Sequence, residues 1–238
     1  WCEANKLCPL PCKPEDIVNY INDLADNAKA NTVSRRVTAI SENHIAGGYQ
    51  ENNPAKHVMV HNAMQAIRRE KGTFQHGKAP ILLETLPLLA DMLSGSDLVT
   101  LRDKALLFLG FAGAFRRSEL VAVQIEDLTF TTQGMVVFIP QSKGDQLGAG
   151  SEIAIPYAPQ KEICAVRAVR NWMEAAGITS GPLFRGFKRN LQPRDTQLND
   201  KAVAEIVKKY MARLGLDPSD FAGHSLRRGF ATSAAQHD

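Results

Sequence analysis

The sequence contains no apolar run long enough to cross a bilayer, and no charged-then-apolar leader precedes Trp1. We therefore expect no membrane partner and, by default, a cytoplasmic location. There is no initiating Met, which indicates a fragment or a processed chain. Internal repeats and low-complexity tracts are also absent.

The chain also lacks a large net charge. The 28 Lys and Arg residues against 25 Asp and Glu give a net charge of +3, too small to predict a nucleic-acid partner by itself. The charge is unevenly distributed, because residues 180–213 contain eight Lys or Arg and three acids. Such a run is commonly a solvated surface, and a surface that faces phosphates is the alternative.

Cysteine is scarce, and its spacing does not match a metal site. Cys2, Cys8 and Cys12 follow a C-x5-C-x3-C pattern without the paired C-x-x-C of zinc sites and without a histidine close by. His57 and His61 stand four residues apart but lack a third ligand. We therefore predict free thiols, no metal and no cofactor.

With 238 residues, 44% of them hydrophobic, the chain is long enough for one large domain or two modest ones. Apolar residues at helical spacing predict helices over 14–28, from a cap at Asn31 or Thr32 to Gly47, and over 54–71. No strand signal precedes residue 75, so the first third is predicted to be all-helical. The residues predicted to face inward are Ile17, Ile21, Leu24, Ala28, Val33, Val37, Ile40, His44, Val60, Met64 and Ile67.

The polar, glycine-punctuated stretch "KGTFQHGKAP", residues 71–80, is typical of a linker. Beyond it the pattern changes to a mixture of helices and short strands. The helix at 100–112 is apolar enough to be buried on nearly all sides. We predict further helices at 84–94, 160–176, 198–214 and from His224, and strands around 123–130, 135–140 and 151–156.

The buried helix is followed by "GAFRRSEL", which contains Arg116 and Arg117. A guanidinium next to a core is costly unless it meets an anion. One interpretation is a structural ion pair with Glu119. The other is that Arg116 forks onto a phosphate while Glu119 orients it.

Two further stretches contribute to this second interpretation. Lys143 lies in the turn "QSKGD" between two predicted strands. In the closing "GHSLRRG", His224 and Arg227 are three residues apart at a helix start and share one helix face, so both side chains can reach one target.

Taken in order, Arg116 with x-S-E-L, the hairpin lysine and H-x-x-R resemble the catalytic domain of the tyrosine recombinases, the phage-type integrases. The helical front end resembles the core-binding domain of the Cre-like branch. The resemblance implies a multidomain fold: an all-α core-binding, DNA-binding domain at 1–72, a linker at 73–80, and a mixed α+β catalytic domain at 81–238. That catalytic domain is mostly helical, with a small three-stranded antiparallel sheet.

The resemblance also implies roles for residues. Arg116 and Arg227 would clamp the scissile phosphate, Lys143 would protonate the leaving 5′ oxygen, and His224 would assist proton transfer. The nucleophile of the family is a tyrosine after H-x-x-R, which forms a 3′-phosphotyrosyl link. No tyrosine follows Arg227 here. Tyr210, the nearest one upstream, belongs by family order to a packing helix, so we expect a missing nucleophile-bearing tail and an inactive fragment.

The implied partners are double-stranded DNA and further copies of the chain in a tetrameric synapse. The residues expected to contact DNA are Arg35, Arg36, Arg68, Arg69, Lys188 and Arg189. Three alternatives remain open at this point: a non-cleaving DNA-binding regulator or accessory protein, a type IB topoisomerase, and a helical interaction module without a DNA role.

Overall fold

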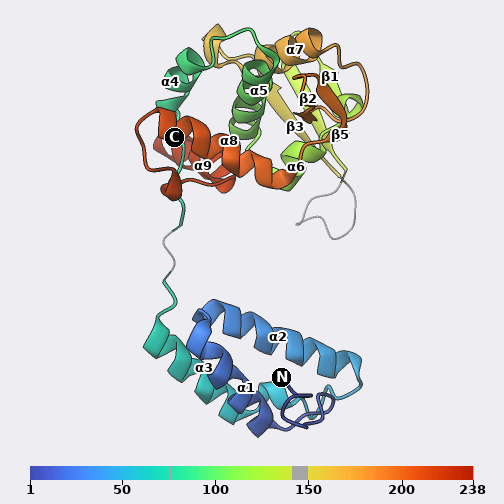
Figure 1. Ribbon diagram of the computed structural model, residues 1–238, viewed down its shortest axis with the longest axis vertical. Coiled ribbons are helices and arrows are strands. Elements are labelled where there is room, and N and C mark those ends of the chain that lie inside the picture. The colour runs from blue at the N-terminus through green and yellow to red at the C-terminus, as the bar shows by residue number, and fades with distance from the viewer. Residues whose placement is uncertain (75–76, 141–149, 238) are drawn as a thin grey trace. The chain divides into compact units, whose positions relative to one another are not determined.

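The computed structural model describes residues 1–74, 77–140 and 150–237. The chain divides into two compact units, Trp1–His76 and Gly77–Asp238, which we call unit 1 and unit 2 (Figure 1). Each unit has a hydrophobic core of its own. Within the described ranges, no helix combines the length and apolar character that a membrane span requires.

Unit 1 is built from three helices, as the apolar spacing predicts. These are α1 (Pro14–Asn27), α2 (Ala30–Ala46) and α3 (Val58–Lys71). Their inward faces are buried or partly buried at one residue in every three or four, which confirms the predicted helical faces. The buried residues include Ile17, Ile21, Val33, His44, Val60, Met64 and Ile67, while Leu24, Ala28, Val37 and Ile40 are partly buried against them.

Two helix starts in unit 1 differ from the prediction. Helix α2 begins at Ala30, before the predicted cap at Asn31 or Thr32, because the Lys29 carbonyl already accepts the first helical amide bonds. The segment predicted as one helix from Pro54 is a 3-10 turn, Pro54–Lys56, followed by α3. The His57 ring separates them, since its Nδ1 accepts the Met59 amide at 3.3 Å and caps α3.

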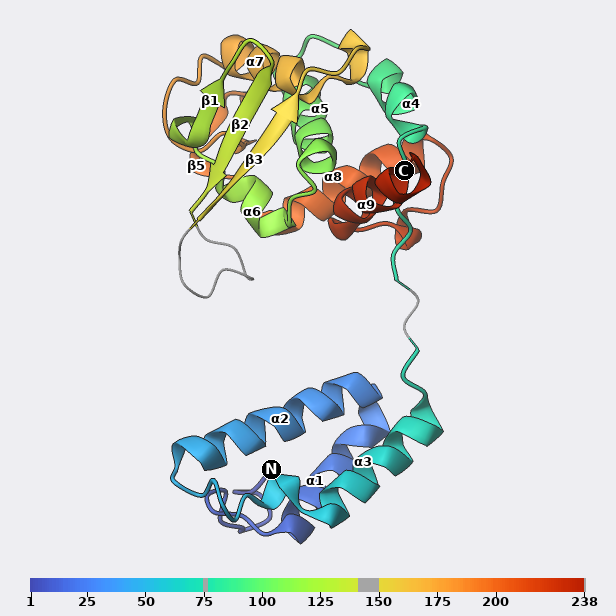
Figure 2. The same ribbon diagram turned by 180° about the vertical axis from the view of Figure 1, so that it is seen from behind.

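Unit 2 is arranged around α5 (Leu98–Ala112), whose residues 105–109 are each at most 1% exposed. Figures 1 and 2 show α5 inside the unit, with the three-stranded sheet on one side and α4 on the other. This confirms the prediction of a helix buried on nearly all sides. The helices around it are α4 (Thr85–Met92), α6 (Arg117–Ala122), α7 (Ala165–Ala176), α8 (Asp200–Arg213) and α9 (His224–His237).

Unit 2 contains the predicted small antiparallel sheet. It consists of β1 (Leu128–Phe130), β2 (Gly134–Ile139) and β3 (Ser151–Pro156) in the order β1-β2-β3. Alternate residues of β2, Met135, Val137 and Ile139, are buried, as expected for a sheet with one face on a core. The first strand is shorter than the predicted 123–130, because a 3-10 turn at Ile125–Asp127 directly precedes Leu128.

A second, two-stranded sheet was not predicted. It pairs β4 (Arg185–Phe187) with β5 (Pro193–Gln197), and its strands are short and mostly polar, so they carry no alternating pattern. Tertiary contacts hold it instead: the Phe187 ring lies 6.1 Å from Trp172 and 4.8 Å below the Arg102 guanidinium. Four other helices in unit 2 lie within a few residues of their predicted bounds.

Candidate active site

The end of α5 places Arg116. The helix ends at Ala112 with Gly113 as its C-cap, Ala114 adopts a left-handed φ of +48°, and the Phe115 side chain returns to the core at 1% exposure. Gly113 fits here because a Cβ at that position would collide with the Phe115 ring. Arg116 then precedes the first residue of α6, so the buried Phe115 fixes where its side chain starts.

Arg116 and Glu119 are bonded twice. The Arg116 amide donates to Glu119 Oε2 at 2.9 Å, and Nη1 lies 2.5 Å from Oε1. The Glu119 side chain is 8% exposed and that of Arg116 is 32% exposed. Among the described residues, Glu119 is the only partner of this guanidinium. A buried carboxylate therefore orients a partly exposed guanidinium, whose other N–H donors bond none of the described residues.

Helix α9 brings Arg227 to the same place. Its Nη1 donates to the carbonyl of Ala114 at 2.8 Å, two residues before Arg116. Leu226 is 1% exposed and packs with Leu120 of α6 at Gly110, where a Cβ would meet both leucines. The structure therefore brings Arg116, Glu119 and Arg227 to the turn after α5. The Arg227 residue is exposed.

His224 is the first residue of α9 and is exposed. It stands one turn before Arg227 on the same side of the helix, as the i, i+3 spacing predicts. Lys143 belongs to residues 141–149, which lie outside the described residues. The strands that flank this segment are paired up to Ile139 and Ser151.

Arg117 has a different environment from its neighbour. Its Nε lies 3.0 Å from Asp200 Oδ2 at the start of α8, and its side chain packs against Gly223, just before His224. Arg117 therefore joins α6 to α8, whereas Arg116 pairs with Glu119 two residues after Ala114, the residue that accepts the bond from Arg227.

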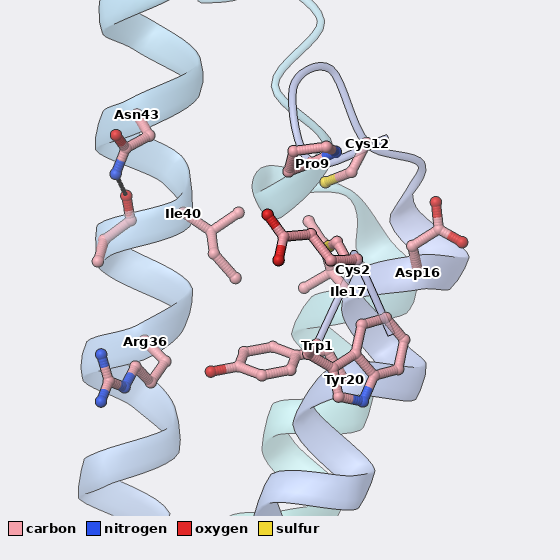
Figure 3. Close-up of a pocket in the computed structure, with 12 residues that line it drawn as sticks. Trp1, Cys2, Pro9, Cys12, Asp16, Ile17, Tyr20, Arg36, Ile40 and Asn43 are labelled. Atoms are coloured by element: carbon pink, nitrogen blue, oxygen red, sulfur yellow. Dashed lines mark hydrogen bonds between the residues drawn. The ribbon is translucent and has the colours of Figure 1, made fainter. Parts of the chain in front are cut away.

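The residues expected to contact DNA lie at the surface. Arg35, Arg36, Arg68 and Arg69 are exposed on α2 and α3, and Arg68 donates to Ser34 Oγ at 3.0 Å. Arg36 also borders a cavity of about 440 Å³ between the N-terminal segment, α1 and α2. Figure 3 shows it on α2, across from Tyr20. In unit 2, Lys188 and Arg189 are exposed between β4 and β5, and Lys188 Nζ lies 4.0 Å from Asp195.

A buried network that sequence reasoning missed surrounds Tyr210. Its hydroxyl donates to Oδ2 of Asp103 at 3.0 Å, and the same carboxylate, which is fully buried, bonds Arg102 and Lys209. Burial and the Asp103 charge raise the pKa of Tyr210 well above its usual value. The signal was present in "RDKALLFLG", because an aspartate inside so apolar a helix needs partners. The Tyr210 hydroxyl does not reach the surface.

The N-terminal cysteines have thiols that are all free. Cys12 lies beside the buried His44, whose Nε2 accepts the Cys12 amide at 3.2 Å and stands 3.5 Å from its Sγ. The opposite ring nitrogen, Nδ1, donates to the Ile40 carbonyl at 2.8 Å. Burial raises the pKa of the Cys12 thiol to about 11, which keeps it protonated and unreactive at neutral pH.

The chain belongs to the phage integrase family, the tyrosine recombinases. The family model matches residues 84–238, which include Arg116, Glu119, His224 and Arg227. A Selenomonas ruminantium protein named integrase/recombinase xerD homolog is 67% identical over 239 residues, covering 100% of this chain and 70% of the relative. The recombinase cre of Escherichia phage P1 is 24% identical over 256 residues, covering 99% of this chain and 72% of that protein.

Solved structures show the same fold. The Tn1549 transposon integrase in complex with transposon right end DNA matches with a TM-score of 0.65 at 15% identity, over 94% of this chain and 73% of the integrase chain. At this identity the likeness concerns the fold alone. The chain spans about 70% of the length of these relatives.

Proposed function

We propose that this chain forms the DNA-binding and phosphate-activating part of a site-specific DNA recombinase. The observation that carries the proposal is the pair Arg116 and Arg227. Among the described residues, each guanidinium has one acceptor: the Glu119 carboxylate in the first turn of α6 for Arg116, and the Ala114 carbonyl in the turn between α5 and α6 for Arg227. Two preorganised guanidinium groups suit the non-bridging oxygens of a phosphodiester, whose charge grows in the pentacovalent transition state.

In the proposed reaction, a tyrosine oxygen attacks the phosphorus and the 5′ oxygen leaves. Lys143 gives that oxygen its proton, and His224 assists proton transfer at the phosphate. The product is a 3′-phosphotyrosyl ester, which conserves the energy of the broken bond, so that attack by a 5′ hydroxyl can rejoin a strand. The tyrosines of this chain, Tyr20, Tyr49, Tyr157 and Tyr210, all precede His224, and Tyr210 is enclosed in the core.

Unit 1 fits the role of a core-binding domain. Its exposed arginines on α2 and α3, together with Lys188 and Arg189 of unit 2, supply cations for the phosphates of duplex DNA. The proposed organisation is a core-binding domain at 1–72, a linker at 73–80 and a catalytic domain at 81–238. Four copies on two duplexes would form the synapse.

The test compares two neighbouring arginines. A target duplex is first selected from a random pool with residues 1–238. The protein expressed from its complete reading frame is then incubated with a nicked form of that duplex, and the covalent adduct is quantified. We expect Arg116→Ala to lower adduct formation by roughly a hundredfold or more while binding changes little. Arg117→Ala is the matched control, because Arg117 pairs with Asp200.

Other outcomes would identify other functions. Selective binding without any adduct would indicate a non-cleaving regulator, and relaxation of supercoils without site preference would indicate a topoisomerase. Negligible binding of duplex DNA at low salt would indicate the remaining alternative, a helical interaction module without a DNA role. Equal loss of adduct in both arginine variants, or loss of binding with Arg116→Ala, would contradict the assignment of Arg116.

A further inference from the structure

The first residues of unit 2, Gly77–Leu83, lie along α9 without forming a helix or strand of their own. We call this segment the strap. It immediately follows the boundary between the units, so the chain enters unit 2 through it. Four of its groups donate hydrogen bonds: Lys78 Nζ to Ser219 O at 2.6 Å, Ala79 N to Asp220 O at 2.7 Å, Ile81 N to Ser225 O at 3.0 Å, and Leu83 N to Ser233 Oγ at 3.0 Å.

Helix α9 is shaped to receive the strap. Gly229 is buried, and a Cβ at this position would overlap the carbonyl oxygen of Ile81. Ser225 and Ser233, which bond the strap, are 0% and 5% exposed. They stand eight residues apart, roughly 12 Å along a helix. The strap therefore fixes α9 over about two turns, both along its axis and around it.

Two adjacent arginines tie α9 to different neighbours. Arg227 donates to Ala114 in the turn before Arg116, whereas Nη1 of Arg228 donates to the carbonyl of Lys78 in the strap at 2.8 Å. Consecutive side chains leave a helix about 100° apart, so the two guanidinium groups reach in different directions. The start of α9 is thus held by two neighbours: the strap, through Arg228, and the turn before Arg116, through Arg227.

We propose that the strap sets the position of Arg227, with Arg228 as the positioning residue, and that DNA bound to unit 1 restrains the start of α9, and with it Arg227, through the strap. The proposal rests on the proposed function, because it requires duplex DNA as the ligand. Its physical basis is that the chain enters unit 2 along the helix that carries His224 and Arg227, to which the strap is held by hydrogen bonds. A passive packing contact would stabilise α9 equally with and without DNA.

The test is hydrogen–deuterium exchange of residues 1–238, free and bound to the selected duplex. In the wild type, we expect DNA to slow exchange of the α9 amides. In Arg228→Ala this slowing should fall roughly threefold to tenfold, the effect of about one hydrogen bond, while the affinity changes by less than about twofold. Arg228→Lys should restore part of it. Arg170→Ala is the control, because Arg170 stacks on Phe130, 4.5 Å away, in another part of unit 2.

One result would overturn the strap proposal: DNA slows exchange of the α9 amides in Arg228→Ala by the same factor as in the wild type. A purely structural role of Arg228 predicts this result, because it would make exchange faster by an equal factor in the free and bound states. If the wild-type chain binds no duplex, the proposed function fails and the strap proposal fails with it. The wild-type binding measurement separates that case from a failure of the strap alone.

Discussion

At the scale of single residues, the Tyr210 hydroxyl is expected to stabilise the core of unit 2 and to take no part in catalysis. We expect Tyr210→Phe to lower the free energy of unfolding of unit 2 by about 1–2 kcal/mol, because the buried Asp103 carboxylate loses a donor. Urea denaturation followed by circular dichroism measures this loss. Adduct formation by the complete protein should be unchanged, since the hydroxyl is enclosed.

Tyr157→Phe is the matched control for this prediction. The Tyr157 ring lies 5.1 Å from the Arg167 guanidinium, and phenylalanine keeps that contact, so we expect a change below about 0.5 kcal/mol. Loss of the adduct in Tyr210→Phe with stability unchanged would contradict the structural role and would make Tyr210 a candidate nucleophile.

At the scale of elements, the start of α5 depends on Asp97. Its side chain accepts the Thr100 amide at 3.0 Å, and hydrogen bonds to Thr100 lower the pKa of this carboxyl. We expect Asp97→Ala to cost about 1 kcal/mol of unfolding free energy at pH 7. A lowered pKa means that the contribution is present above the unfolded value, about 4, and is lost as the pH falls through the folded value.

Urea titrations at pH 7 and pH 3 check this prediction. The difference between Asp97→Ala and the wild type should narrow at the lower pH, whereas Asp97→Asn, which keeps an acceptor, should lose less at pH 7. An equal difference at both values would show that the Asp97 charge has no part in the cap.

At the scale of the whole molecule, two units with separate cores present exposed cations on both. We expect binding of the selected duplex to weaken steeply with salt, and the slope of log K against log salt to become shallower by roughly one for each phosphate-contacting arginine removed. Arg35→Ala and Arg36→Ala are therefore expected to reduce the slope together by about two. Arg170→Ala should leave it unchanged, and an unchanged slope in the α2 variants would move the DNA contact elsewhere.

The helices could be predicted because their signals are local. A face repeated every three or four residues marks α1, α3 and α7, and the apolar run of α5 requires burial wherever it lies. Short elements were missed or displaced. Helix α6 has six residues and β4 has three, too few for a period to show, and contacts such as that of Phe187 with Trp172 decide their structure.

In the candidate site, too, some features follow from local sequence and others depend on long-range contacts. The sequence by itself determined which residue types stand in which order, the pairing of Arg116 with Glu119 three residues later, and the common face of His224 and Arg227, because these depend on local geometry. Only the tertiary structure decided that Arg227 meets Ala114, 113 residues away, that Arg228 holds Lys78 across 150 residues, and that Asp103 encloses Tyr210. Contacts over such separations depend on the path of the whole chain, which no local pattern records.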